Sequence, residues 1–229
     1  MDNPLQIAID GPVSSGKSDI SGRLAKELGL TYLYTGAMYR ALAWICVQEG
    51  VSFKDAPNVY PLLAKYSIDL RPPAKDGSHG FAVWVGNTDV TDKLFTPAMS
   101  QGSSDVSTIP QVRKFMVARQ QELARGKSVV MEGRDIGLRV LPQAQLKIYL
   151  TASLEERARR RWNQYKTKDP TKTLAQEIDE TKIRDTQDTS RAADPLQKLP
   201  DAWELDTTDM TQEQVVDAII QELKRRNLL

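Results

Sequence analysis

Residues 6–18 read QIAIDGPVSSGKS, and this stretch decides the fold. The run QIAID has the composition of a buried strand, and the amphipathic pattern of residues 18–28 predicts a helix soon after it. Between the two, residues 11–18 match G-x-x-x-x-G-K-[ST], a pattern that requires this strand–loop–helix context. The stretch therefore predicts a phosphate-binding loop in an α/β protein.

The residue types of this loop explain its chemistry. Gly16 lets the backbone turn so that successive N–H groups point at phosphate oxygens, and the N-terminus of the following helix adds partial positive charge. Lys17 can reach the β- and γ-phosphates, and the Ser18 hydroxyl can bind Mg²⁺. Asp19 beside it is best interpreted as an outward-facing acid in the first helical turn. The predicted nucleoside triphosphate site comprises Gly11, Pro12, Val13, Ser14, Ser15, Gly16, Lys17 and Ser18.

Short β-rich runs alternate with helical patterns along the rest of the chain. Four further runs have the composition of buried strands, at residues 31–34, 128–132, 146–152 and 202–208. Amphipathic stretches such as residues 111–125 lie between several of them, and a capping-box pattern of Thr211 with Gln214 begins a last helix. This alternation predicts one α/β domain over residues 1–229, with a five-stranded parallel sheet flanked by helices.

Two regions interrupt the alternation. Residues 67–97 read as short strands with Gly86-Asn87 as a hairpin turn, which predicts a small antiparallel insert. Residues 164–173 are polar and lie between two charged helical patterns, which suggests a mobile lid. The single histidine, His79, lies in a glycine-flanked loop of the insert and is expected to be solvated.

Composition limits the class of protein. Hydrophobic residues make up 40% and charged residues 27%, while 31 Lys and Arg balance 30 Asp and Glu, so no basic field predicts nucleic-acid binding. The single cysteine, Cys46, lies in an apolar run and is expected to be a small buried hydrophobic residue in a reducing compartment. Neither a signal peptide nor a membrane span is predicted, so we expect a cytoplasmic protein.

Arginine clusters suggest where an acceptor could bind. In LEERARRRW, Glu155 with Arg159 and Glu156 with Arg160 form a solvated ion-paired face, which leaves Arg157 and Arg161 facing each other. An anion would relieve that arrangement, although a solvated face explains it equally well.

A second cluster is more specific. Arg184, Asp188 and Arg191 follow at i, i+4 and i+7, so they share one helical face and form either a structural ion pair or a phosphate site with a carboxylate for a sugar hydroxyl. Arg134 and Asp135 follow a predicted strand, at the end where ligands of parallel sheets gather. Thr35 and Arg40 likewise follow residues 31–34.

Several motifs together are similar to one family. IAIDGPVSSGKS, YLYTGAMYR, IPQVR, VVMEGRDIG, LTASLEERARRR and RDTQDTSRAADPL occur in this order and cover nearly the whole chain. They resemble bacterial cytidylate kinases, nucleoside-monophosphate kinases with a phosphate-binding loop. The resemblance implies transfer of the γ-phosphoryl group of ATP to CMP or dCMP with Mg²⁺, by a protein that is generally monomeric. It also implies that residues 67–97 form the monophosphate-binding extension and that residues 157–173 contain the lid.

The resemblance further implies roles for single residues. Lys17 acts on the transferred group, and Ser18 binds Mg²⁺. Arg134, Arg184 and Arg191 hold the acceptor phosphate and stabilise the transition state, whereas Arg157 reaches the ATP phosphates from the lid side. The implied CMP-binding set is Thr35, Arg40, Ser104, Arg113, Arg134, Asp135, Arg184, Asp188 and Arg191, in which Ser104, Arg113 and Asp135 read cytosine and Asp188 holds the ribose.

The chain departs from the family pattern at three places, where it has Tyr34 before Thr-Gly, Asp19 after GKS and Leu138 after GRDIG. Two alternatives remain at this stage. A related kinase could prefer UMP or AMP, although adenylate kinases typically have D-G-F-P-R where this chain has MEGRDIG. A catalytically silent nucleotide-binding module would tolerate loss of the acceptor arginines, and this chain has all of them.

Overall fold

The computed structural model describes residues 4–71, 80–167 and 169–229, and it shows an α/β fold. Five parallel strands form the main sheet in the order β2-β6-β1-β7-β8. The strands are β1 (Gln6–Asp10), β2 (Thr31–Tyr34), β6 (Val129–Gly133), β7 (Leu146–Thr151) and β8 (Trp203–Asp206). The five predicted strands and their parallel pairing are therefore confirmed, with bounds that differ by at most two residues.

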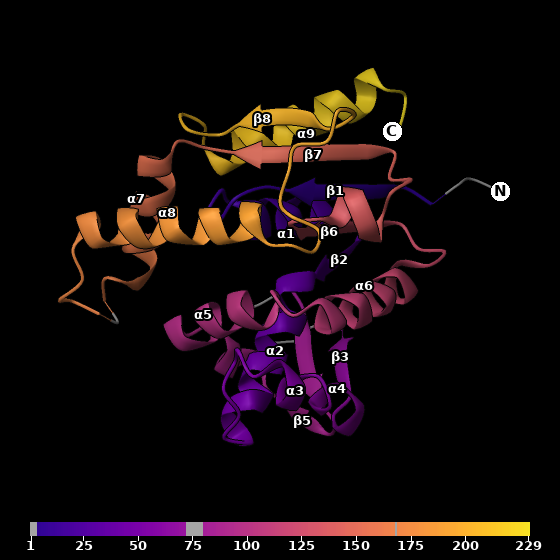
Figure 1. The fold of residues 1–229 in the computed structure, drawn as a ribbon. Coiled ribbons are helices and arrows are strands. Elements are labelled where there is room, and N and C mark those ends of the chain that lie inside the picture. Colours follow the sequence, from indigo (N-terminus) through magenta and orange to yellow (C-terminus); the bar gives the residue numbers. More distant parts are fainter. Residues whose placement is uncertain (1–3, 72–79, 168) are drawn as a thin grey trace.

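Helices cover the sheet and extend from its carboxyl end. Helix α1 (Lys17–Leu28) and helix α9 (Gln212–Arg225) share one apolar cluster with the sheet, in which Ile20 and Leu24 pack with Ile219. The predicted capping box of α9 is confirmed, because Thr211 and Gln214 exchange both bonds. Helices α7 (Leu154–Tyr165) and α8 (Leu174–Ser190) lie at the carboxyl end of β7 (Figure 1).

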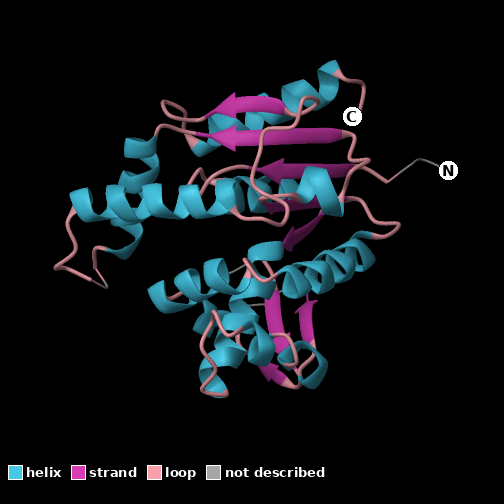
Figure 2. Ribbon diagram, in the orientation of Figure 1, coloured by secondary structure: helices cyan, strands magenta, loops and turns pink. Residues whose placement is uncertain are grey.

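The remaining helices form the lower half of Figure 1 together with a second sheet. Strands β3 (Ile68–Arg71), β4 (Ala82–Val85) and β5 (Thr88–Asp89) pair antiparallel, and Gly86 turns the chain with φ at 58°. The predicted insert and hairpin are thus confirmed over the described residues, while His79 lies outside them. The helices of this half are α2 (Thr35–Gln48), α3 (Ala56–Val59), α4 (Leu62–Lys65), α5 (Pro97–Val106) and α6 (Pro110–Ala124), with a 3₁₀ turn η1 (Thr91–Leu94). Figure 2 shows the two sheets and the helices between them.

The apolar core of this lower half is organised around α2. Its residues Met38, Leu42 and Ile45 are buried against the antiparallel sheet and α6. Cys46 is fully buried in the same cluster, and burial raises the pKa of its thiol to about 11, so it packs as the small hydrophobic residue that the sequence predicts.

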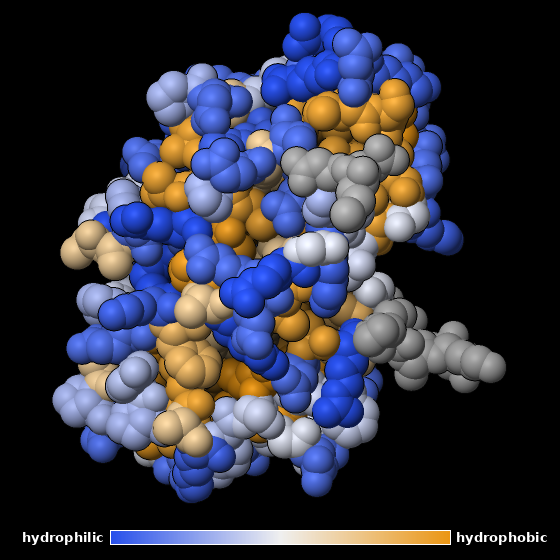
Figure 3. All heavy atoms as spheres, turned by 90° about the vertical axis from the view of Figure 1, so that its right-hand side faces the viewer, coloured by the Kyte–Doolittle hydropathy of each residue, from blue (hydrophilic) through white to orange (hydrophobic). Residues whose placement is uncertain are grey.

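The polar segment between α7 and α8 begins after Tyr165 and ends at Thr173, which forms a capping box with Gln176. The face drawn in Figure 3 is mainly hydrophilic, with smaller hydrophobic areas between charged side chains. None of the helices in the described part of the chain combines the length and apolar composition needed to cross a membrane.

Candidate active site

The loop between β1 and α1 has backbone conformations that glycine permits. Gly16 has φ at 91°, and a Cβ atom on Gly11 would lie 2.0 Å from the carbonyl oxygen of Leu150, so a side chain cannot be accommodated there. Just before the loop, the buried carboxylate of Asp10 accepts backbone N–H bonds of 2.8 Å from Ile136 and Gly137. Burial raises the pKa of Asp10 to about 6 despite these bonds. Asp10 thereby fixes the segment after β6 beside the loop.

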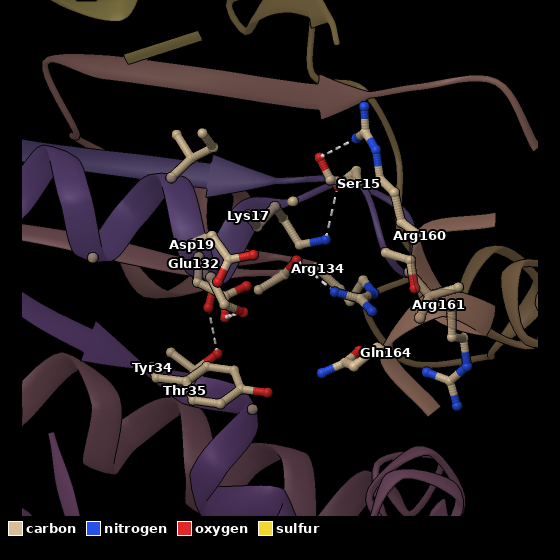
Figure 4. Close-up of a pocket in the computed structure, with 18 of the residues that line it drawn as sticks. Ser15, Lys17, Asp19, Tyr34, Thr35, Glu132, Arg134, Arg160, Arg161 and Gln164 are labelled. Carbon is tan, nitrogen blue, oxygen red and sulfur yellow. Dashed lines mark hydrogen bonds between the residues drawn. The ribbon is translucent and has the colours of Figure 1, made fainter. Parts of the chain in front are cut away.

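Lys17 is buried at the start of α1 and folds back on its own loop. Its ammonium donates to the carbonyl oxygen of Pro12 at 2.6 Å and to Ser15 Oγ at 3.2 Å. Burial, together with nearby Arg134, lowers the pKa of Lys17 to about 7. Figure 4 shows Lys17 and Arg134 at the same cavity, with Arg161 and Gln164 across from them. Among the described residues, the Lys17 ammonium therefore donates only to neutral oxygens of its own loop.

Oxygen ligands suited to Mg²⁺ lie next to this lysine. Ser18 Oγ donates to Glu132 Oε1 at 2.9 Å, and Glu132 is buried at the carboxyl end of β6. Hydroxyl and carboxylate oxygens are the hard donors that Mg²⁺ prefers. Among the described residues, no group of three or more His, Cys, Asp or Glu side chains is arranged to hold a metal ion.

Three arginines from different elements converge on one hydroxyl. Ser100 Oγ, fully buried in α5, lies 2.7 Å from Arg184 Nη1, 3.4 Å from Arg161 Nη2 and 3.5 Å from Arg40 Nη2. Burial lowers the pKa of Arg184 to about 10, and among the described residues its Nε has no hydrogen-bond partner. The hydroxyl is neutral, and of the three arginines Glu177 pairs only with Arg161, so the arrangement suits a bound anion.

A fourth guanidinium pairs with the carboxylate of α8. Arg134 Nε donates to Asp188 Oδ2 at 2.7 Å. Burial alone would raise the pKa of Asp188, but Arg134 and Arg184 more than offset it and hold that pKa below its ordinary value. The predicted shared face of α8 is correct for Arg184 and Asp188. Arg191 follows the last helical residue, Ser190, but it lines the same cavity.

A second group of charges lies further along the cavity. Arg113, buried in α6, forms a close ion pair with Asp135 Oδ2, and Arg191 Nη2 lies 3.5 Å from Asp135 Oδ1. Ser104 Oγ is buried nearby in α5 and lacks a partner among the described residues. An acid, a guanidinium and an unpaired hydroxyl can together read a base that both donates and accepts.

One cavity of about 1190 Å³ connects these groups. Of the predicted residues, it is lined by Val13, Ser14, Ser15, Gly16, Lys17, Ser18, Thr35, Arg40, Ser104, Arg113, Arg134, Asp135, Arg184, Asp188 and Arg191. Gly11 and Pro12 belong to the loop but not to this lining.

Thr35 donates from its hydroxyl to the Glu132 carbonyl oxygen at 2.7 Å, and the ring of Tyr34 stacks on Phe95 at 6.4 Å between ring centroids.

Arg157 is placed differently from the sequence-based expectation. It does not line the cavity; its guanidinium donates to the carbonyl oxygens of Ala152 and Val13, and to Asp185 at 2.6 Å. Arg161 lines the cavity instead and pairs with Glu177 at 2.7 Å, so the two arginines do not face each other. Arg157 therefore lies behind the loop, against Val13, and does not border the cavity. A direct contact of Arg157 with ATP stays a prediction.

Sequence reasoning also missed several residues. Glu156 pairs with Arg160, as predicted, and also with Arg159, whose expected partner was Glu155. Arg160 lines the cavity and donates to the Thr207 carbonyl oxygen at 2.6 Å. Glu132 also lines the cavity. Its place at the carboxyl end of a predicted strand could have marked it as a site residue. Asp19 was predicted as an outward-facing acid, and this is confirmed, because it is exposed at the cavity rim, where it accepts a bond of 3.4 Å from Gln212.

Comparisons with known proteins identify the family of this chain. The sequence model of the cytidylate kinase family matches residues 7–225. The chain is 42% identical to the cytidylate kinase of Caldanaerobacter subterraneus subsp. tengcongensis over 221 residues, which is 96% of this chain and 95% of that protein. It is 43% identical to the cytidylate kinase of Geobacillus kaustophilus over 226 residues, which is 99% of each.

A solved structure shares the fold at low sequence identity. An uncharacterized protein from Eubacterium ventriosum superposes with a TM-score of 0.51 at 10% identity, over 96% of this chain and 98% of the other, and this likeness concerns the fold alone. The family match and the two relatives cover almost the whole chain, including the cavity described above. The chain therefore belongs to the cytidylate kinase family and is a kinase.

Proposed function

We propose that this protein transfers the γ-phosphoryl group of ATP to CMP or dCMP, forming ADP and CDP or dCDP, with Mg²⁺ as its cofactor. The observation that carries the proposal is the single cavity that joins the phosphate-binding loop to three guanidiniums around the neutral Ser100 hydroxyl. An acceptor that itself carries a phosphate would supply the missing anion. The relatives named cytidylate kinases support CMP as that acceptor.

On the donor side, residues 11–18 would hold the ATP phosphates through backbone N–H groups. Lys17 would exchange the Pro12 carbonyl oxygen for phosphate oxygens, which restores a full charge on its ammonium. Ser18 would hold Mg²⁺ together with the phosphates, and Glu132 would orient the Ser18 hydroxyl. When bound, Mg²⁺ neutralises charge on the phosphates.

On the acceptor side, Arg40, Arg134, Arg184 and Arg191 would hold the CMP phosphate in line with the donor. Phosphoryl transfer requires positioning and positive charge on the equatorial oxygens rather than covalent catalysis. Arg134 and Arg184 would stabilise the charge of the transition state, because both line the cavity beside Asp188 and Arg134 also lies near Lys17. Asp188 would accept from a ribose hydroxyl, and Thr35 would border the monophosphate.

Base recognition would involve the charges next to α6. The amino group of cytosine would donate to Asp135. Arg113 and the Ser104 hydroxyl, which lacks a partner within the described part of the chain, would donate to the ring nitrogen and carbonyl oxygen. Uracil presents a carbonyl oxygen where cytosine has the amino group, so Asp135 would repel it. Arg157 would act from behind the loop through Val13, and the segment after Tyr165 would close as a lid that excludes water.

A coupled assay of ADP release with CMP, dCMP, UMP, AMP and GMP tests this proposal. We expect the highest kcat/KM with CMP or dCMP. The Lys17→Ala variant should lose activity by about 10³-fold or more, because the transferred phosphoryl group loses its cation. A preference for UMP or AMP would overturn the acceptor assignment, and near-wild-type turnover by the variant would overturn the donor assignment.

A further inference from the structure

Asp194 has a backbone conformation that is unusual for a residue with a side chain. It lies four residues after the end of α8 and has φ at +50°, in the left-handed region. The N–H of Leu196 donates to the carbonyl oxygen of Asp188 at 2.8 Å and ties the loop to α8. Aspartate tolerates this backbone region better than most residues, but the conformation persists only where the surroundings hold it.

Those surroundings are three arginines. The Asp194 carboxylate accepts from Arg113 Nε at 3.3 Å through Oδ2, and from Arg139 Nε through Oδ1. Its main-chain carbonyl oxygen accepts from Arg191 Nε at 2.8 Å and also from Arg191 Nη2. One residue therefore contacts Arg113 with its side chain and Arg191 with its backbone, and both arginines line the cavity.

Asp194 itself does not line the cavity, whereas Asp135 does. Asp135 binds the same two arginines from the cavity side, so Arg113 and Arg191 each lie between two aspartates. The side chain of Arg113 is only 2% exposed. Burial tends to raise the pKa of Asp194, but Arg139 and Arg113 hold it below its ordinary value, so Asp194 is ionised at neutral pH.

This arrangement matters when Asp135 engages a base. Under the proposed function, Asp135 accepts from the cytosine amino group and gives up part of its bonding to Arg113 and Arg191. A buried guanidinium that loses its carboxylate is strongly disfavoured. Another carboxylate, outside the cavity, would keep Arg113 charged and oriented toward the base while Asp135 turns to the substrate.

We propose that Asp194 is a positioning residue that holds Arg113 and Arg191 for acceptor recognition without touching the substrate. This inference rests on the proposed function. The alternative is that Asp194 serves only to fix its loop through the exposed Arg139. The two readings differ in which kinetic constants a substitution changes, because only the first links Asp194 to the acceptor nucleotide.

The test compares Asp194→Asn with the matched control Arg139→Gln. Asparagine keeps the shape, tolerates the backbone conformation and retains the carbonyl bond to Arg191, while it removes the charge facing Arg113. We expect Asp194→Asn to raise KM for CMP about tenfold and to lower the CMP-to-UMP ratio of kcat/KM about five- to tenfold. KM for ATP should stay within about twofold of wild type. Arg139→Gln should leave all three quantities within about twofold.

The double variant Asp194→Asn/Asp135→Asn provides a second measurement. Because both carboxylates hold Arg113, we expect a loss of CMP binding larger than the product of the single losses. Unchanged KM for CMP in Asp194→Asn, an equal rise in KM for ATP, or the same losses in Arg139→Gln would each overturn the inference. A wild-type protein without preference for CMP would instead refute the proposed function itself.

Discussion

Replacing Arg184 with methionine should stabilise the protein while it disables the reaction. Arg184 is a half-buried cation beside Ser100. Among the described residues its Nε lacks a hydrogen-bond partner, and its Nη1 bonds only to the neutral Ser100 hydroxyl. Methionine has a similar length without charge or donors. Ser100 would retain Arg40 and Arg161, and Asp188 would retain Arg134, so the substitution leaves no buried acid unpaired.

The magnitude follows from the lowered pKa. Burial lowers the pKa of Arg184 from 12.5 to about 10, and at about 1.4 kcal/mol per pKa unit this difference corresponds to about 3 kcal/mol. Arg184 also borders the cavity, where water relieves part of that cost, and one hydrogen bond is lost. We therefore expect a gain of roughly 1–2 kcal/mol in the free energy of unfolding, or about 2–8 °C in Tm for a chain of this size. Since the folded-state pKa lies near 10, the cost is present throughout the neutral range.

Two assays measure the outcome. Thermal unfolding without nucleotide should show the higher Tm, and adding CMP should raise the Tm of wild type more than that of Arg184→Met. Coupled ADP release should show kcat/KM for CMP lower by about 10²-fold or more, since a guanidinium at the transferred group is lost. Arg159→Met, on the exposed face of α7, is the control and should change both quantities little. A Tm at or below that of wild type would refute the reasoning about uncompensated charge, and normal activity would refute the role in transfer.

Three further predictions concern other groups of the site. Asp135→Asn should reduce the preference for CMP over UMP about 10- to 150-fold, because a charge-assisted hydrogen bond is worth about 1.5–3 kcal/mol; steady-state kinetics with both acceptors decides, and unchanged discrimination would contradict it. ATP affinity should fall as the pH rises above 7, because Lys17, whose pKa burial lowers to about 7, must regain a proton to hold phosphate. Titration calorimetry at pH 8 in two buffers of different protonation enthalpy should then show uptake of close to one proton, and no uptake would contradict it. Glu177→Gln should destabilise the protein by about 3–5 kcal/mol, since the fully buried Glu177 pairs with Arg161 and Lys172 at 2.7 Å each; urea unfolding measures this loss, and a change under 1 kcal/mol would contradict it.

The local elements of this protein follow from patterns only a few residues long. The loop after β1 needs its glycines because Gly11 approaches the Leu150 carbonyl oxygen and Gly16 has a positive φ. These are the two glycine positions of the G-x-x-x-x-G-K-[ST] motif. The hairpin at Gly86, the capping box at Thr211 and the alternation of strands and helices are likewise local. Such features depend on backbone sterics and on periods of 2 and 3.6 residues, so the sequence by itself determined them.

Only the tertiary structure decided which charges meet. Arg157 and Arg161 are four residues apart on one helix, yet Arg157 binds Asp185 behind the loop and Arg161 lines the cavity with Glu177 as its partner. Ser100 and Arg184 are 84 residues apart, and Arg113 and Asp194 are separated by 81. Their contacts depend on how α5, α6, α7 and the loop after α8 pack around a common cavity. Packing of distant elements is set by the whole core rather than by any short pattern. For that reason the sequence predicted the local Glu156–Arg160 pair but not the distant partners of Arg113, Arg161 and Arg184.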